Sequence, residues 1–225
     1  MPEIGFAGQD KISKAKVLVI GAGGLGCPAL LYLAGMGVGT LGIVDNDTVH
    51  LSNLHRQILY KEIDIGKPKA EIASEYIRQL NSSIHIIPLV ERITDENIES
   101  ICTNYEILVD CTDNVESRTT ISNYGNRLDK PVVFGAVQQF EVMVTVFNKQ
   151  FTFNNLFPEN SVLPNTSCAQ EGILGHVAGL LACLMVNEVV KIILGLEGVL
   201  SGKVLTTNLK SGRQRILTLN KKILK

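Results

Sequence analysis

The chain has no tryptophan, few aromatic residues (5%), no C-x-x-C pair and almost no net charge (−1). A net charge near zero gives no electrostatic reason to expect nucleic acid or an anionic membrane as a partner. Five cysteines, an odd number without paired spacing, argue against a disulfide framework and against a standard zinc site. The segment before residue 17 is polar and does not read as a signal peptide. These absences predict a protein of the reducing cytoplasm.

One apolar segment, at residues 173–194, resembles a membrane-spanning helix in length and apolar composition. It is interrupted by polar and charged residues: His176, Asn187, Glu188 and Lys191. A membrane-spanning helix needs about 20 predominantly apolar residues, and charges within it are costly. We therefore predict a buried or dimer-interface helix, for which the substitution Val186→Asp is expected to yield monomers.

Apolar runs alternate with helical patterns as far as residue 136. The apolar runs predict strands at residues 17–20, 40–44, 84–88, 107–109 and 132–136. The helical patterns between them predict helices at residues 24–36, 68–80, 95–102 and 115–129. Strands this apolar, separated by helices, are typical of a parallel sheet covered on both faces.

The pattern changes after residue 136. Residues 141–147 alternate polar and apolar side chains, as an antiparallel strand with one wet face does. A long polar loop is expected at 148–172, and residues 203–207 and 214–219 predict a closing hairpin. The predicted fold class is α/β: a Rossmann-like, mainly parallel sheet with helices on both faces, extended by antiparallel strands near the C-terminus.

The length of 225 residues suits one α/β domain, and no linker or repeat divides the chain. We therefore expect a single domain over residues 1–225, with a nucleotide-binding core at 15–136 and a second half at 137–225.

The first predicted strand runs into a glycine turn of the form G-x-G-x-x-G, made by Gly21, Gly23 and Gly26. Such a turn lets backbone N–H groups and a helix N-terminus approach phosphate. Asp45 ends the next apolar run, where a carboxylate can accept hydrogen bonds from a ribose. A nucleotide is therefore the predicted ligand.

The segment DCTDN at 110–114 ends one predicted strand and opens a helix. Asp113 fits the N-cap of that helix, because Asp and Asn are favoured there. It also fits a carboxylate that holds Mg²⁺ together with substrate phosphates. The sequence leaves both interpretations open.

Asn53, Arg56 and Gln57 share one face of a helical turn, as an ordinary solvated polar turn also would. Arg56 can neutralise phosphate with bidentate hydrogen bonds. Lys67 and Lys69 lie at a predicted helix start, where the helix dipole disfavours cations unless an anion compensates. A triphosphate would compensate Lys69, whereas Lys67 is expected to point to water.

Cys168 lies in a polar loop directly before the helix predicted at 173–194. A helix N-terminus favours thiolate over thiol, so Cys168 is the candidate nucleophile, with an inert loop cysteine as the alternative. The other cysteines have apolar or helical settings and are predicted to be packing residues.

Several segments, in this order, resemble the ThiF/MoeB/HesA family, bacterial relatives of the ubiquitin-activating enzymes. They are GAGGLG at 21–26, IVDND at 43–47, LSNLHRQ at 51–57, GKPKAE at 66–71, LVDCTDNVESR at 108–118, VVFGA at 132–136 and CAQEGILG at 168–175. The resemblance implies an adenylyltransferase that uses ATP and Mg²⁺. Its substrate would be the C-terminal glycine of a small ubiquitin-like sulfur carrier ending in Gly-Gly. The products are an acyl-adenylate and pyrophosphate, for sulfur transfer in thiamine or molybdopterin cofactor biosynthesis.

The resemblance also implies roles for individual residues. Gly24 would lie against the phosphates, Asp45 would hold the ribose, and Asp113 would carry Mg²⁺. The implied catalytic residues are Arg56, Lys69, Asp113 and, where a persulfide or thiol linkage to the carrier is used, Cys168. The implied nucleotide-binding residues are Gly21, Gly23, Gly24, Gly26, Asp45, Asp47, Asn53, Arg56, Gln57, Lys69, Asp113 and Asn114. The half at 137–225 would bind the carrier, with its loop over the diglycine tail, and form a homodimer.

Two features of the family pattern are missing. No arginine precedes Arg56, whereas most relatives carry one that reaches into the partner subunit's ATP site. FTFNNLF stands at 151–157 where the first of two C-x-x-C zinc pairs is expected, so zinc is not expected. A catalytically impaired scaffold that binds nucleotide or carrier is therefore an alternative. A relative that modifies a tRNA base or a peptide also stays open. An NAD-dependent oxidoreductase is disfavoured, because Arg56, Lys69 and Asp113 suit a triphosphate.

Overall fold

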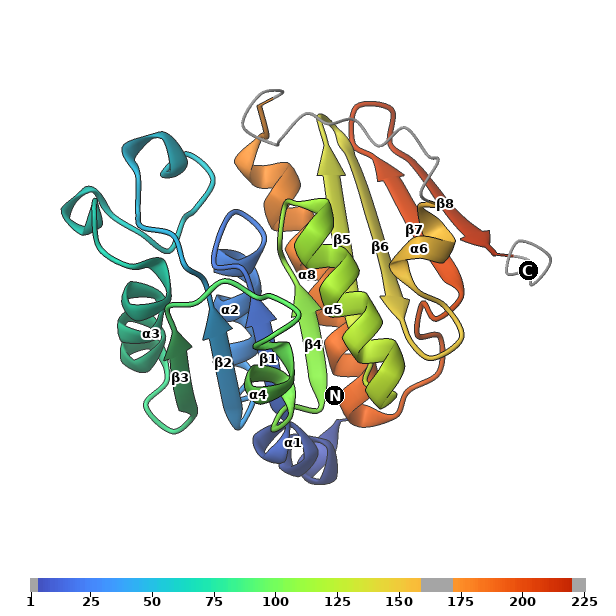
Figure 1. The fold of residues 1–225 in the computed structure, drawn as a ribbon, viewed down its shortest axis with the longest axis horizontal. Helices are drawn as coiled ribbons and strands as arrows, with labels where there is room; N and C mark the ends of the chain where they lie inside the picture. The colour runs from blue at the N-terminus through green and yellow to red at the C-terminus, as the bar shows by residue number, and fades with distance from the viewer. Residues whose placement is uncertain (1–3, 159–171, 220–225) are drawn as a thin grey trace.

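The computed structural model describes residues 4–158 and 172–219, which build one eight-stranded sheet (Figure 1). Its strand order is β3-β2-β1-β4-β5-β6-β7-β8. The parallel part holds β1 (Lys16–Ile20), β2 (Thr40–Val44), β3 (His85–Leu89), β4 (Ile107–Asp110) and β5 (Val132–Gln138). The antiparallel extension holds β6 (Glu141–Phe147), β7 (Lys203–Asn208) and β8 (Arg213–Thr218). The predicted fold class is thus confirmed.

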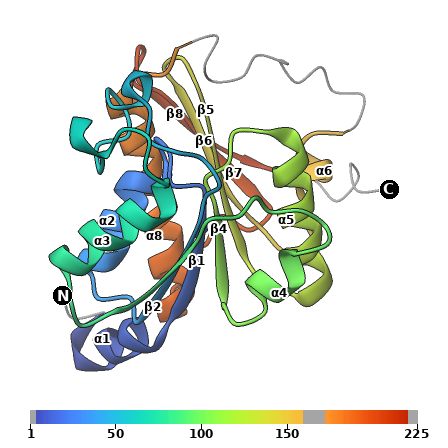
Figure 2. The ribbon, with the colours of Figure 1, turned by 60° about the vertical axis from the view of Figure 1, so that its left-hand side comes forward.

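Helices cover both faces of the sheet (Figure 2). One face carries α1 (Gly5–Lys14), α2 (Gly26–Gly35), α3 (Lys69–Leu80) and α8 (Gly175–Leu194). The other face carries α4 (Ile98–Cys102), α5 (Val115–Leu128) and α6 (Phe153–Leu156). Successive side chains of a strand point to opposite faces, so Val17 and Val19 join the core under the first set, and Leu18 and Ile20 join the core under the second. The central strands are consequently apolar except at their ends.

Two helices were not predicted from the sequence. The segment of α1 is polar and buries only Gly8 and Ile12, so it carries little apolar periodicity. A contact with α8 fixes the position of α1, because Lys11 Nζ donates to the carbonyl of Leu194 at the end of α8 at 3.2 Å. The short helix α6 lies within the segment that we expected to be a loop, and its Phe153 packs against Phe134 of β5. Cys168 lies outside the described residues.

Within residues 4–158 and 172–219, only α8 is long and apolar enough to cross a membrane, yet half of its apolar window is buried inside the protein. Glu188, one of the charges that interrupt the run, is buried and accepts a hydrogen bond from the N–H of Leu200 at 2.9 Å. It also pairs with Lys191. These charges tie α8 to the connection before β7, so α8 is a core helix, as predicted.

The register of α8 corrects one expectation. Val186 is only 6% exposed and belongs to the core within the subunit. An aspartate there would bury an unpaired charge, so Val186→Asp would impair folding rather than report on a dimer interface.

Candidate nucleotide-binding site

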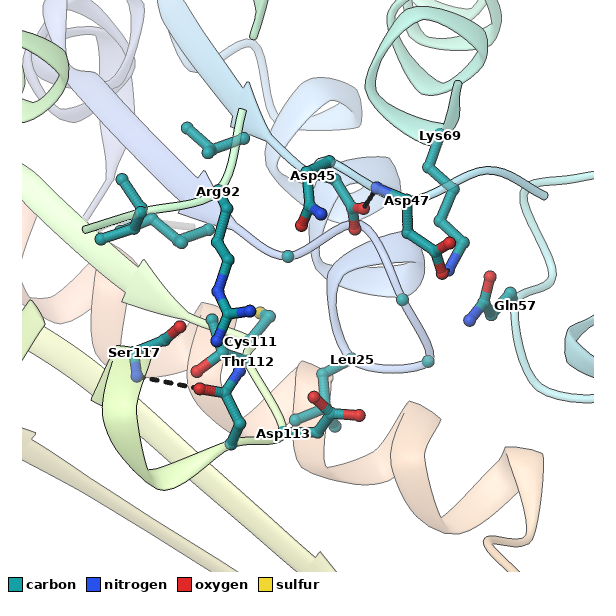
Figure 3. Close-up of a pocket in the computed structure, with 18 of the residues that line it drawn as sticks. Leu25, Asp45, Asp47, Gln57, Lys69, Arg92, Cys111, Thr112, Asp113 and Ser117 are labelled. Carbon is teal, nitrogen blue, oxygen red and sulfur yellow. Dashed lines mark hydrogen bonds and ion pairs between the residues drawn. The ribbon is translucent and has the colours of Figure 1, made fainter. Parts of the chain in front are cut away.

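A cavity of about 420 Å³ lies beyond the carboxyl ends of β1, β2 and β4 (Figure 3). Of the residues that the sequence assigned to nucleotide binding, all except Gly26 line it. This is the edge where ligands bind in open α/β sheets. The structure therefore brings together segments that are up to about ninety residues apart in the sequence.

The glycine turn after β1 is shaped by close backbone contacts. Gly21 has a φ of +97°, and a Cβ there would lie 2.8 Å from the carbonyl oxygen of Cys111. At Gly26, which begins α2 and packs behind the turn, a Cβ would lie 1.9 Å from the carbonyl oxygen of Gly21. Glycine is required at both positions, because no side chain fits between these segments. The helix consequently starts at Gly26, two residues later than predicted.

Asp45, at the end of β2, connects the glycine turn after β1 to the loop that follows β2. One carboxylate oxygen accepts the N–H of Ala22 at 2.7 Å, and the other accepts the N–H of Asp47 at 2.8 Å. Burial raises the pKa of Asp45 above its ordinary value, and these two N–H groups oppose that rise. Each oxygen keeps a lone pair, so the carboxylate is oriented and can still accept a ribose hydroxyl.

Lys69 and Asp47 form an ion pair at 2.5 Å on the side of the cavity away from β4. The Lys69 side chain is 6% exposed and that of Asp47 is 49% exposed. Burial by itself would raise the pKa of Asp47, but the hydrogen bonds from Lys69 and from the N–H of Thr48, together with the charges of Lys69 and His50, outweigh it, so the pKa is lowered. The Lys69 ammonium therefore already has an anionic partner, and a phosphate would share it with Asp47.

Gln57 and Arg56 lie beside this pair. Gln57 is 4% exposed, and its side-chain oxygen has no hydrogen-bond partner in the described part of the chain. Arg56 contacts the carbonyl of Ser52 at 3.3 Å and the ring of His55 at 3.4 Å. It makes no ion pair with any described residue. The unpaired guanidinium suits an anionic ligand, whereas the free amide oxygen of Gln57 can accept a hydrogen bond from a ligand donor.

The β4–α5 turn excludes one of the two interpretations of the DCTDN segment, in which Asp113 is the N-cap of α5. Asn114 is the N-cap of α5, since its side-chain oxygen accepts the N–H of Ser117 at 2.9 Å. Asp113 is exposed and, within residues 4–158 and 172–219, has no hydrogen-bond or ion-pair partner. Its carboxylate therefore stays available to a ligand in the cavity.

The residues present fit ATP with Mg²⁺. The described residues contain no group of three or more His, Cys, Asp or Glu side chains that could hold a metal alone. Mg²⁺ needs only one or two carboxylates beside substrate phosphates, and Asp113 offers one. The absence of a zinc site stays a prediction.

The position of Lys67 differs from the prediction that it points to water. Lys67 does not simply point to water, because its ammonium lies 3.4 Å from the carboxylate of Asp64, whose side chain is 3% exposed. That carboxylate also accepts the hydroxyl of Tyr76 at 2.8 Å. Lys67 therefore belongs to the loop scaffold and does not line the cavity.

Sequence reasoning missed Arg92, which lines the cavity from the connection after β3. Arg92 lies between the strand predicted at 84–88 and the helix predicted at 95–102, but no glycine turn or recognisable motif marks it in the sequence. It also missed Arg118 of α5, which donates to the carbonyl of Thr112 at 2.8 Å and lies over the ring of Phe134 at 5.2 Å.

A second cavity, of about 510 Å³, adjoins the first. Asp113, Arg118, Val137 and Ile173 line both. Its remaining walls come largely from the antiparallel part of the sheet, including Arg213 and Arg215 of β8, and from the segment at Phe157. The two cavities consequently meet at the β4–α5 turn.

Comparison with known proteins agrees with this geometry. The chain is 44% identical over 209 residues to the "Adenylyltransferase and sulfurtransferase MOCS3" of Culex quinquefasciatus, covering 91% of this chain and 48% of that protein. It is 42% identical over 214 residues to a "Probable molybdopterin-synthase adenylyltransferase" of Porphyra purpurea, covering 92% of this chain and 56% of that protein. The chain thus spans about half the length of these curated relatives.

Among solved structures, Escherichia coli MccB with ATP superposes with a TM-score of 0.81 at 23% identity. That match covers 94% of this chain and 66% of MccB, and it supports the fold. The model of the ThiF family matches residues 1–223. This chain therefore belongs to the ThiF family.

Proposed function

We propose that this chain is an adenylyltransferase that uses ATP and Mg²⁺ to activate the C-terminal glycine of a small ubiquitin-like sulfur carrier. Family membership and the names of its relatives support adenylation. The name of the Porphyra relative favours a molybdopterin-type carrier, and a thiamine-type carrier is the second candidate.

The observation that carries this proposal is the junction of the two cavities at Asp113. A triphosphate at the glycine turn would fill the first cavity. An extended, side-chain-free tail would reach it through the second, past Ala136, Val137 and Ile173. An unpaired carboxylate at this junction lies where the carrier carboxylate and the α-phosphate must meet.

The chain's own residues would act by positioning and by neutralising charge. The N–H groups of the glycine turn would hold phosphate, and Asp45 would fix the ribose. A tail carboxylate oxygen would then attack the α-phosphorus, with pyrophosphate leaving. Arg56 would neutralise the charge that develops on the phosphate oxygens, and Asp113 would hold Mg²⁺, which supplies further charge neutralisation when bound.

The test is ATP–pyrophosphate exchange with Mg²⁺ and a panel of carriers ending in Gly-Gly, each beside its tail-deleted form. Exchange that requires an intact tail is expected, and the active carrier would identify the pathway. Measurable ATP binding without exchange for any carrier would contradict adenylation and support the scaffold alternative.

We also propose that the protein forms a homodimer through α8. On α8, Cys183 is exposed and Leu180 and Leu184 are half-buried, and on the adjacent α2 Tyr32 is 55% exposed. Apolar side chains that stay partly exposed on a core helix and its neighbour are typical of a subunit interface.

Cys183→Asp is expected to convert the dimer to monomers in light scattering, because the exposed charge would be buried without a partner at the interface. Leu128→Asp is the matched control, since Leu128 is 39% exposed on α5, on the opposite face of the sheet. A dimer that persists in Cys183→Asp, or a monomeric wild-type protein, would refute this interface.

A further inference from the structure

Arg92 contributes a cation to the nucleotide cavity from an unexpected direction. It follows β3, the strand next to β2, and its guanidinium extends across the cavity toward the β4–α5 turn (Figure 3). Lys69 and Gln57 lie on the other side of Asp45 (Figure 3). Arg92 is thus at the end of the cavity away from these phosphate-binding candidates.

The backbone around Arg92 is firmly held. Ile93, the next residue, is 5% exposed and packs in the core. The side-chain amide of Asn97 donates to the carbonyl of Arg92 at 2.8 Å, and its oxygen accepts the N–H of Thr94 at 2.8 Å. The backbone position of Arg92 is therefore fixed before a ligand binds.

The guanidinium itself is held only weakly. It donates to the carboxylate of Glu116 at 2.7 Å, but the two side chains are 54% and 80% exposed. An ion pair between exposed side chains contributes little to stability, because water screens it and both side chains lose freedom. A ligand that offers a better contact can therefore recruit the guanidinium away from Glu116.

A nucleobase in this cavity has no aromatic side chain to stack on among the described residues. Two other guanidinium groups line the cavity, but that of Arg118 lies over the ring of Phe134 and that of Arg56 donates to the carbonyl of Ser52. The lining of the cavity includes no phenylalanine, tyrosine or histidine, and its apolar side chains near Arg92 are the aliphatic Val44 and Ile93. A guanidinium is planar and stacks on aromatic faces, which an ammonium or an aliphatic chain cannot do.

We propose that Arg92 stacks on the adenine of bound ATP and closes the nucleoside end of the cavity. This role rests on the proposed nucleotide site. With the triphosphate at the glycine turn after β1 and the ribose at Asp45 after β2, the base extends toward the loop after β3. Arg92 is a binding residue for the base, and it takes no part in phosphate chemistry.

The test is calorimetric binding of ATP, adenosine and inorganic tripolyphosphate to the whole protein and its variants. Arg92→Ala is expected to weaken ATP and adenosine by about tenfold and to leave tripolyphosphate unchanged. Arg92→Lys should not restore affinity, because lysine keeps the charge and loses the plane. Pyrophosphate exchange should show a raised KM for ATP with an unchanged kcat.

Two variants serve as controls. Arg127→Ala removes a similar exposed ion pair, to Glu99 at 3.1 Å and outside the cavity, and should leave all three affinities unchanged. Glu116→Gln should also retain affinity for ATP, because the pair is not itself required.

Four results would overturn the proposal. Weaker tripolyphosphate binding by Arg92→Ala, or rescue by Arg92→Lys, would make Arg92 a phosphate ligand. Unchanged affinities in Arg92→Ala would show that it does not touch the nucleotide, and an equal loss in Glu116→Gln would make the ion pair structural. Binding is measured without a carrier, so a protein that binds ATP but fails to adenylate would refute the proposed function while still testing Arg92.

Discussion

Asp113→Ala is expected to lower the rate of ATP–pyrophosphate exchange by about 1000-fold, because among the described residues it removes the one unpaired carboxylate at the junction of the two cavities. A metal at a transferring phosphoryl group stabilises the transition state by several kcal/mol, and each 1.4 kcal/mol is about a factor of ten in rate. Folding should be unaffected, because Asp113 is exposed and Asn114, not Asp113, caps α5.

The isosteric variant Asp113→Asn separates charge from shape. It retains the size of the side chain and an acceptor oxygen but loses the negative charge, so it should be nearly as impaired as alanine. Raising the Mg²⁺ concentration should recover part of its activity. Full exchange activity in both variants, at ordinary Mg²⁺, would eliminate Asp113 as the metal ligand and remove the main support for the mechanism.

Arg56→Ala is also expected to reduce exchange by about 1000-fold, with the loss mainly in kcat. The guanidinium lies over the glycine turn, where its methylene carbons would contact a Cβ on Gly24 at 3.5 Å, and it has no carboxylate partner among the described residues. An arginine that neutralises charge on a transferring phosphoryl group contributes about 1000-fold or more. Most of that effect should appear in the chemical step, because the charge develops there.

Arg56→Lys should restore only part of the activity, since an ammonium cannot make two parallel hydrogen bonds to one phosphate. Arg127→Ala, which removes an exposed arginine on the other face of the sheet, controls for a general loss of positive charge. An Arg56→Ala protein with an unchanged kcat and only a raised KM for ATP would show that Arg56 binds the ground state and does not stabilise the transition state.

Most of the fold was predictable because the central strands are apolar on both faces. The strands β1, β2, β4 and β5 are centred on continuous apolar runs separated by helical patterns, and runs this short and rich in β-branched residues favour strands. The exact ends were less predictable. The helix α2 begins at Gly26, after the glycine turn, whereas the helical pattern of the sequence begins two residues earlier.

The parts that could not be predicted depend on residues distant in the chain. The helix α1 has weak periodicity and is held by Leu194. The choice between Asp113 and Asn114 as the cap of α5 depends on backbone angles that both residues tolerate. Arg92 reaches the cavity only because β3 lies beside β2 in the sheet, and no local pattern in the sequence records that neighbour.

The contact between α1 and α8 has a consequence for how the protein is made. Lys11 and the carbonyl that it contacts are 183 residues apart, and ribosomes add about 5–20 residues per second, so α1 waits on the order of ten seconds or more for its partner. During that interval the apolar side of α2 that α8 will cover stays open to water and to chaperones. The wall of the nucleotide cavity at Ala178 belongs to α8 as well. Vectorial synthesis therefore delays completion of the cavity until α8 has left the ribosome.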